Sequence, residues 1–157
     1  MNRECLSLSA EETERFGERF SATLSDFDVV YLSGGLGAGK TCLARGVARG
    51  LSASPREVAS PTFALLHEYA GREGRIVLRH LDLYRLEDSP RDLEVLGLPE
   101  SVAGAPVLVE WPNRALRAVL PPTKEVTLEQ LPEGQRRILV IDVSPHAAGG
   151  GEGSRSL

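Results

Sequence analysis

The chain has 157 residues, of which 41% are hydrophobic and 25% are charged, and its net charge at pH 7 is −4. This size predicts a single domain over residues 1–144, and the Gly- and Ser-rich residues 145–157 predict a flexible C-terminal tail. The apolar runs are too short to cross a membrane, and acids stand where a signal peptide needs an apolar core, so we expect a cytoplasmic protein without membrane contact. The basic residues are scattered, which argues against nucleic acid being held by this chain alone.

The N-terminal third of the chain predicts a helix, a strand and a second helix. Ser9 and Glu12 have the spacing of a capping box, and apolar residues follow at helical intervals, which predicts a helix from about Ala10 to Leu24. The apolar run Val29–Leu32 predicts a buried strand. A helix-like stretch then covers residues 40–51.

The rest of the chain predicts two hairpins separated by a helix and a strand. Alternating residues around Gly-containing turns predict hairpins. A Ser-Pro pair at residues 89–90 predicts the start of a short helix that ends near Gly97. In chain order, we expect a hairpin of 64–69 and 75–81, a helix of 90–97, a strand of 106–110 and a hairpin of 125–131 and 136–143.

Residues 34–41 carry a phosphate-binding motif between the first predicted strand and the second predicted helix. They read Gly-Gly-Leu-Gly-Ala-Gly-Lys-Thr and match G-x-x-x-x-G-K-[ST], the P-loop pattern, in its proper structural context. Backbone N–H groups of such a loop surround the phosphates, while Lys40 reaches the β- and γ-phosphates and Thr41 offers its hydroxyl to Mg²⁺. The element order around this motif predicts a three-layer α/β P-loop NTPase fold whose sheet mixes parallel and antiparallel strands.

Candidate acids stand at the ends of two predicted strands. Asp82 and Glu110 each follow an apolar run, and ligands of open α/β sheets bind at the carboxyl ends of the strands. Either acid could hold Mg²⁺ while the other orients the attacking water, and the residues alone leave this open. Trp111, next to Glu110, is a candidate to stack on the base, to meet a partner or to anchor the core.

Three further residue types call for an interpretation. The segment Ser60-Pro61-Thr62 resembles a loop that switches with the state of the nucleotide, with a plain turn as the alternative. His67 and His80 lack other metal ligands nearby in the sequence, so we interpret them as structural. Cys5 and Cys42 lie far apart and predict neither a disulfide nor a zinc site.

Taken together, four segments resemble the bacterial TsaE family. They are the P-loop, Ser60-Pro61-Thr62-Phe63, residues 80–86 (His-Leu-Asp-Leu-Tyr-Arg-Leu) and Val109-Glu110-Trp111. The resemblance implies an ATPase that works with the TsaB and TsaD proteins in the synthesis of threonylcarbamoyladenosine in tRNA, with tRNA contacted only through that complex. It implies ATP and Mg²⁺ as cofactors.

The resemblance also implies roles for individual residues. Lys40 and Thr41 would contact phosphate and magnesium, Glu110 would be the Walker B acid that also holds the metal, and Asp82 would be an acid of a switch region. Lys40, Asp82 and Glu110 are thus the candidate catalytic residues. The candidate nucleotide contacts are Thr13, Gly35, Leu36, Gly37, Ala38, Gly39, Lys40, Thr41, Cys42, Trp111 and Arg137.

One position departs from the family, and two other functions remain as alternatives. Gly35 stands where the family often has Asp, and little loss is expected because the interior of a P-loop acts through its backbone. The alternatives are a small-molecule P-loop kinase, which would need an Arg-rich lid that we do not find, and a guanine-nucleotide switch, which would need an Asn-Lys-x-Asp segment. No arginine is obviously placed as a transition-state finger, so we expect slow hydrolysis without partner proteins.

Overall fold

The computed structural model describes residues 2–53, 66–95, 98 and 102–143. Its strands are β1 (Asn2–Ser7), β2 (Val29–Ser33), β3 (Leu66–Ala70), β4 (Ile76–Asp82), β5 (Val107–Glu110), β6 (Lys124–Gln130) and β7 (Arg136–Asp142). Its helices are α1 (Ala10–Ser21), α2 (Lys40–Gly50), α3 (Pro90–Val95), α4 (Arg114–Val119) and the short 3₁₀ helix η3 (Pro132–Gly134).

The described strands form one mixed sheet in the order β1-β7-β6-β2-β5-β4-β3. β2 pairs in parallel with both β5 and β6, and β5 pairs in parallel with β4. The outer pairs β1–β7, β6–β7 and β3–β4 are antiparallel. The predicted mixture of parallel and antiparallel strands is therefore confirmed.

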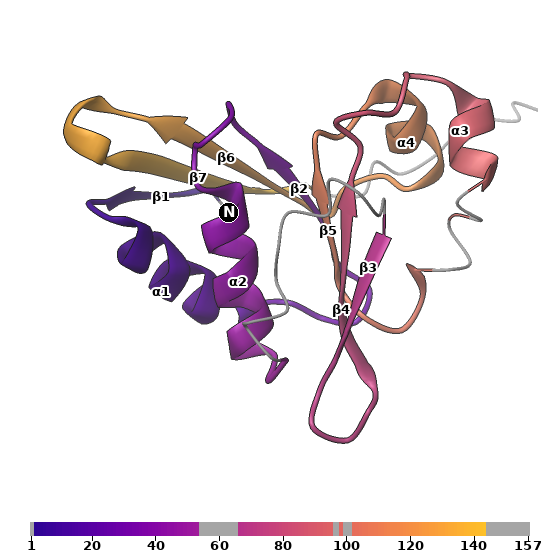
Figure 1. The fold of residues 1–157 in the computed structure, drawn as a ribbon, viewed down its shortest axis with the longest axis horizontal. Coiled ribbons are helices and arrows are strands. Elements are labelled where there is room, and N and C mark those ends of the chain that lie inside the picture. The colour runs from indigo at the N-terminus through magenta and orange to yellow at the C-terminus, as the bar shows by residue number, and fades with distance from the viewer. Residues whose placement is uncertain (1, 54–65, 96–97, 99–101, 144–157) are drawn as a thin grey trace, which may run out of the picture.

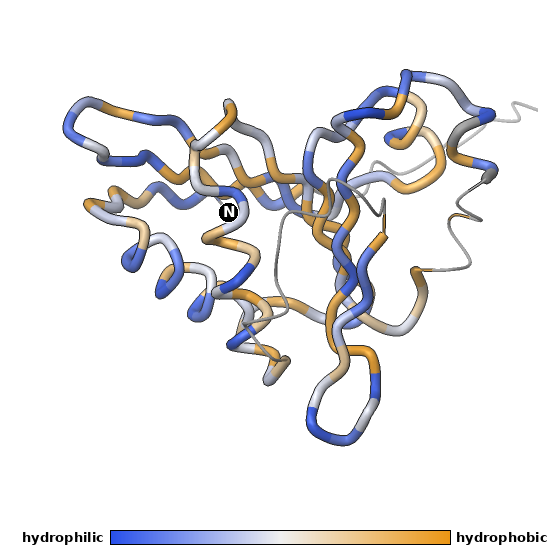
Figure 2. The backbone as a smooth tube through the Cα atoms, in the orientation of Figure 1, coloured by the Kyte–Doolittle hydropathy of each residue, from blue (hydrophilic) through white to orange (hydrophobic). Residues whose placement is uncertain are grey.

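Helices cover both faces of this sheet, which gives the predicted three layers (Figure 1). β2 runs through the centre, and its alternate residues enter two different cores: Val30 and Leu32 face the core that includes α2, whereas Val29 and Tyr31 face the core that includes α3 and α4. Both faces of a central parallel strand are buried, so β2 reads as a continuous apolar run rather than as an alternating one. Figure 2 shows the resulting contrast between the apolar central strands and the hydrophilic outer side of α1.

Glycines let α1 and α2 pack closely on one face of the sheet. A Cβ added at Gly46 of α2 would lie 1.9 Å from the carbonyl oxygen of Glu14 in α1, and one added at Gly17 would lie 2.3 Å from the carbonyl oxygen of Leu43. Only residues without a side chain permit this approach. The contact places α1 beside the beginning of α2, where the P-loop ends.

The predicted N-cap of α1 is confirmed. The side chain of Ser9 accepts a hydrogen bond from the backbone N–H of Glu12 at 3.1 Å, and a carboxylate oxygen of Glu12 accepts the backbone N–H of Leu8 at 2.7 Å rather than that of Ser9. The helix ends at Ser21, three residues before the predicted end at Leu24. The first turn of α1 is thus fixed by its own side chains.

Two described elements had no counterpart among the sequence predictions. β1 is an edge strand whose residues alternate poorly in polarity, and only Ser7 within it is buried, so no burial pattern marks it. α4 has six residues and is capped by Asn113, which accepts the backbone N–H of Leu116 at 2.8 Å. A helix this short gives too few turns for its period to be recognised.

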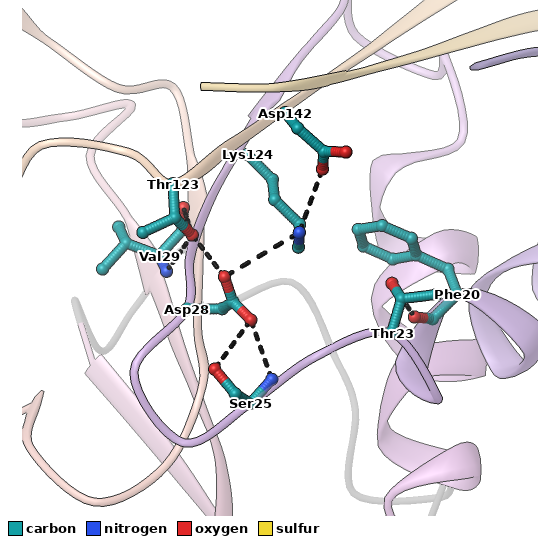
Figure 3. Close-up of polar contacts among 8 residues, drawn as sticks. All are labelled: Phe20, Thr23, Ser25, Asp28, Val29, Thr123, Lys124 and Asp142. Atoms are coloured by element: carbon teal, nitrogen blue, oxygen red, sulfur yellow. Dashed lines mark hydrogen bonds and ion pairs between the residues drawn. The ribbon is translucent and has the colours of Figure 1, made fainter. Parts of the chain in front are cut away.

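A polar network fastens the start of β2 to its neighbours at the opposite end of the sheet from the P-loop (Figure 3). The Asp28 carboxylate accepts a hydrogen bond from Thr123 Oγ1 at 2.6 Å and two from Ser25, through its backbone N–H at 2.8 Å and its hydroxyl at 2.9 Å. Lys124 Nζ lies 4.0 Å from Asp28 Oδ1 and 3.0 Å from Asp142 Oδ1. These contacts connect β2, β6 and β7 through side chains in addition to the sheet.

Some predictions fall on residues outside the described ranges. They are the switch-like segment Ser60-Pro61-Thr62, the end of the helix near Gly97 and the tail over 145–157. Together with the domain boundary at residue 144, they stay predictions. Over the ranges that are described, no helix is long and apolar enough to cross a membrane.

Candidate functional site

The carboxyl ends of three parallel strands meet at one edge of the sheet and form the candidate site. β2 ends at the P-loop, and the register pairs Leu32 of β2 with Glu110 of β5 and Glu110 with Asp82 of β4. A cleft of about 290 Å³ opens there. Its lining comprises Leu36, Gly37, Ala38, Gly39, Lys40, Thr41, Cys42, Asp82, Tyr84, Glu110, Trp111 and Arg136.

The P-loop curls through two left-handed glycines. Gly37 has φ +76° and Gly39 has φ +106°, backbone conformations that side-chain-bearing residues rarely adopt. Gly39 is also the N-cap of α2, so the helix begins at the loop and directs the positive end of its dipole into the cleft. The β6–β7 hairpin supports the loop from the side, because Gln130 Nε2 donates a hydrogen bond to the Gly37 carbonyl at 2.9 Å.

Lys40 is buried within the loop that it serves. Its Nζ donates hydrogen bonds to the carbonyl oxygens of Gly34 at 2.7 Å and Gly35 at 3.0 Å, and it lies 4.2 Å from the centre of the Trp111 ring. Burial lowers the pKa of the Lys40 ammonium group, and the negative charges of Glu110 and Asp82 oppose part of that shift. The ammonium group therefore lies among ligands that a phosphate can replace.

The two candidate acids are both buried at this edge. Asp82 is 4% exposed and Glu110 is 3% exposed. Asp82 Oδ1 accepts the backbone N–H of Tyr84 at 2.9 Å, and Glu110 Oε1 lies 2.9 Å from His80 Nε2. Two carboxylates held close to one lysine form a strongly charged, poorly hydrated site.

The donor chemistry of the cleft fits a magnesium ion bound together with a nucleotide. Thr41, Asp82 and Glu110 present oxygen atoms, which a hard cation prefers. No group of three His, Cys, Asp or Glu side chains arranged to hold a metal was found among the described residues. Mg²⁺ is usually bound by one or two carboxylates together with water and substrate phosphates, so a small protein ligand set is the one expected for it.

Trp111 lies at the cleft rather than in either apolar core. Its φ is +55°, a left-handed conformation that is strained for a bulky residue and is common at functional sites. Its ring contacts that of Tyr84, with 5.0 Å between centroids, and covers Lys40. Base stacking and partner contact by Trp111 stay predictions.

Three predicted nucleotide contacts, Thr13, Gly35 and Arg137, lie outside the cleft lining. Thr13 is fully buried in α1 beneath the loop, where its hydroxyl lies 2.8 Å from that of Ser7 and donates to the Ser9 carbonyl. Gly35 is not among the lining residues, although its carbonyl binds Lys40. A Cβ at Gly35 would meet nothing within 4 Å, so the loop has room for either Gly or the Asp that the family often has at this position.

The arginine that lines the cleft is Arg136 and not the predicted Arg137. Arg137 faces the other side of β7, where it pairs with Glu4 at 3.2 Å and Glu129 at 3.1 Å. Arg136 Nη1 donates a hydrogen bond to the Gly134 carbonyl at 3.0 Å, and its buried Nε has no hydrogen-bond partner in the described part of the chain. Since successive strand residues point to opposite faces, an offset of one residue exchanges a surface position for a site position.

Sequence reasoning also missed Tyr84 as a lining residue. It lies two residues beyond Asp82, in the segment that carries the resemblance, and it is 52% exposed at the cleft. The position after a strand-end acid was the available signal, because that loop must pass the ligand crevice.

Comparison with known proteins identifies the family. The family model described as threonylcarbamoyl adenosine biosynthesis protein TsaE matches residues 7–138. This chain belongs to the TsaE family. It is 40% identical over 137 residues to the tRNA threonylcarbamoyladenosine biosynthesis protein TsaE of Treponema pallidum, covering 87% of this chain and 98% of the relative. It is 37% identical over 135 residues to the TsaE of Bacillus subtilis, covering 85% and 74% of the two chains.

A solved structure agrees with this assignment. The crystal structure of YdiB from Bacillus subtilis superimposes with a TM-score of 0.68 at 27% identity, covering 92% of this chain and 87% of that one. The resemblance to TsaE and the P-loop NTPase fold inferred from the sequence are both confirmed. As a member of the TsaE family, the chain is involved in the biosynthesis of threonylcarbamoyladenosine in tRNA.

Proposed function

We propose that this chain binds and hydrolyses ATP with Mg²⁺ in the cytoplasm, as a subunit that acts on a TsaB and TsaD complex during tRNA modification. The observation that carries the proposal is the convergence of four groups in one cleft. Lys40 and Thr41 come from the P-loop, whereas Asp82 and Glu110 come from the ends of neighbouring parallel strands. Phosphate binding, metal binding and water activation need these groups together.

Nucleotide binding would use the loop and the helix that follows it. The backbone N–H groups of residues 35–42 and the N-terminus of α2 attract the phosphates. Lys40 would exchange its bonds to the Gly34 and Gly35 carbonyls for the β- and γ-phosphate oxygens. This exchange keeps the ammonium group hydrogen-bonded in both states, which avoids the cost of an unpaired buried charge.

The acids would divide the remaining work between metal and water. Thr41 and Glu110 would hold Mg²⁺, which when bound neutralises charge on the phosphate oxygens. Asp82 would accept a hydrogen bond from the attacking water, with its carboxylate oriented by the N–H of Tyr84. Arg136, in place of Arg137, would contact the phosphates because its guanidinium group lines the cleft.

Partner proteins would raise the rate by completing the site. Arg136 donates a hydrogen bond to the Gly134 carbonyl of the β6–β7 hairpin. The rim of the cleft includes Leu36, which is 71% exposed, and Tyr84. An apolar rim beside a charged cleft suits coverage by a protein surface, which would exclude water and strengthen the charges inside. tRNA would be contacted through TsaB and TsaD, since the chain itself is acidic.

The test is ATP hydrolysis by the purified chain with and without TsaB and TsaD from the same source, at equal Mg²⁺. Stimulation by the pair, absent in the Glu110→Gln variant, is the expected result. Release of ADP that depends on an added metabolite would support the kinase alternative instead. Tight GTP binding that ATP does not displace would support a guanine-nucleotide switch.

A further inference from the structure

His80 is a buried histidine directly beneath the candidate site. It is 0% exposed, and its Nε2 lies 2.9 Å from Glu110 Oε1. Its strand β4 runs parallel to β5 with His80 opposite Leu108 and Asp82 opposite Glu110, so the histidine lies two residues below the carboxylate pair. Its role as a plain core residue does not account for this contact.

The hydrogen-bond chemistry gives the imidazole one direction. An ionised carboxylate can only accept, so the hydrogen of this bond is carried by Nε2. The other ring nitrogen, Nδ1, is buried and finds no hydrogen-bond partner within the described ranges. The His80 ring lies against that of Tyr69, with 6.4 Å between centroids, and a purely packing role there would be served better by an apolar side chain, because a buried polar atom without a partner is costly.

We propose that His80 is a positioning residue that fixes the Glu110 carboxylate for metal binding. The inference rests on the proposed function, in which Glu110 holds Mg²⁺. With Oε1 bound to His80, the rotation of Glu110 is restricted and its second oxygen is left for the ion. Such partners of metal ligands orient them, and their loss costs about 10- to 100-fold in metal affinity.

Lys40 gives this restraint a purpose. It shares the cleft with Glu110, and an ammonium group and a carboxylate in one poorly hydrated cleft attract each other. Without His80, the Glu110 carboxylate would be free to turn toward the ammonium group. A direct Lys40–Glu110 pair would take one group from the phosphates and the other from the metal.

Substitutions at His80 separate this role from packing. In His80→Gln, the side-chain amide nitrogen takes a position close to that of Nε2 and keeps a donor for Glu110, whereas the shorter amide of His80→Asn stays polar and does not reach. His80→Leu removes the donor at similar volume. Leu78→Ala is the control for a loss of packing alone, because Leu78 lies in the same strand and in the core cluster that includes Tyr69, the ring beside His80.

The measurement is Mn²⁺ binding by electron paramagnetic resonance in the presence of ADP, together with the ADP affinity in excess EDTA. We expect His80→Asn and His80→Leu to weaken Mn²⁺ binding by about 10- to 100-fold. The metal-free ADP affinity should stay within about twofold, because the P-loop supplies it. His80→Gln should recover most of the Mn²⁺ affinity. Leu78→Ala should lower the Tm and leave the Mn²⁺ affinity at the wild-type value.

The contrary results are equally distinct. Wild-type Mn²⁺ affinity in folded His80→Asn, or an equal loss in His80→Gln and His80→Asn, overturns the positioning role and leaves the proposed ATPase standing. If His80→Leu does not fold, the Gln and Asn pair still decides the matter. Failure of the unaltered chain to bind Mn²⁺ with ADP contradicts the proposed function itself, and the inference falls with it.

Discussion

Replacing Gly46 by Ala should destabilise the protein, although Ala is the better helix former. Helix propensity alone predicts a gain of about 0.8–1 kcal/mol for this change within α2. The structure predicts the opposite sign, because the new Cβ would lie 1.9 Å from the backbone oxygen of Glu14, where ordinary contact begins at 3.4 Å. Helix α1 would have to retreat by about 1.5 Å, and its backbone cannot yield as the end of a side chain could.

The magnitude follows from the cost of overpacking. Inserting a methyl group into a packed interior costs about 1–3 kcal/mol, and more where backbone is the obstacle. Because the obstacle here is backbone, the cost lies at the upper end, about 2–3 kcal/mol. Subtracting the propensity gain of about 1 kcal/mol leaves a net loss of about 1–2 kcal/mol, which lowers the Tm by about 2–8 °C in a domain of this size. The retreat of α1 would also withdraw Thr13 from Gly39, so the ADP affinity should fall as well.

The assay is thermal unfolding followed by circular dichroism, with Gly35→Ala as the matched control. Gly35 undergoes the same chemical change at a position where the new Cβ meets nothing within 4 Å, so its Tm should stay within about 2 °C of the wild-type value. A Tm for Gly46→Ala equal to or above that of the wild type would refute the packing argument. It would mean that the two helices can separate without cost.

Three further predictions concern the site and the base of the sheet. Lys40→Met should keep the fold and weaken ATP affinity by about 10- to 150-fold in calorimetry, the effect of losing one charged phosphate contact; unchanged affinity would contradict the site assignment. Gln130→Ala should weaken ADP affinity by about 2- to 10-fold through loss of its bond to the P-loop, whereas Glu129→Ala in the same hairpin should not; equal affinities would deny the hairpin a supporting role. Burial raises the pKa of Asp28, but its bonds from Thr123 and Ser25 outweigh that effect and hold the pKa below its ordinary value. The contribution of ionised Asp28 to the free energy of unfolding should therefore be complete above about pH 4, and it should be lost as the pH falls through the lowered pKa. In denaturant unfolding, the difference in free energy of unfolding between the wild type and Asp28→Asn should become smaller in acid. A difference that does not change with pH would contradict this.

Local patterns in the sequence predicted a large part of the fold. The capping box at Ser9 and Glu12 marked the start of α1, and the apolar run of β2 next to the P-loop marked the central strand with its helix. Both signals arise from neighbours in the chain, where spacing reports geometry directly. β1 and α4 escaped prediction because an exposed edge strand and a helix of six residues owe their conformation to the elements they pack against.

The candidate site divides in the same way. The P-loop fixes Lys40 and Thr41 by local sequence, and the strand ends point to Asp82 and Glu110, because parallel strands bring their carboxyl ends to one edge. Sequence alone could not choose between Arg136 and Arg137, since the side of the sheet that each residue faces depends on the register of β7.

The role of His80 was decided entirely by tertiary structure. In the sequence it has no other metal-ligating residues nearby, so it was interpreted as structural. Only the pairing of β4 with β5 brings its ring to Glu110, 30 residues away along the chain. The sequence by itself determined the phosphate-binding loop, the class of fold and the family, because these rest on contiguous motifs. The orientation of the candidate catalytic side chains was decided by strand register and helix packing, which join residues far apart in the chain.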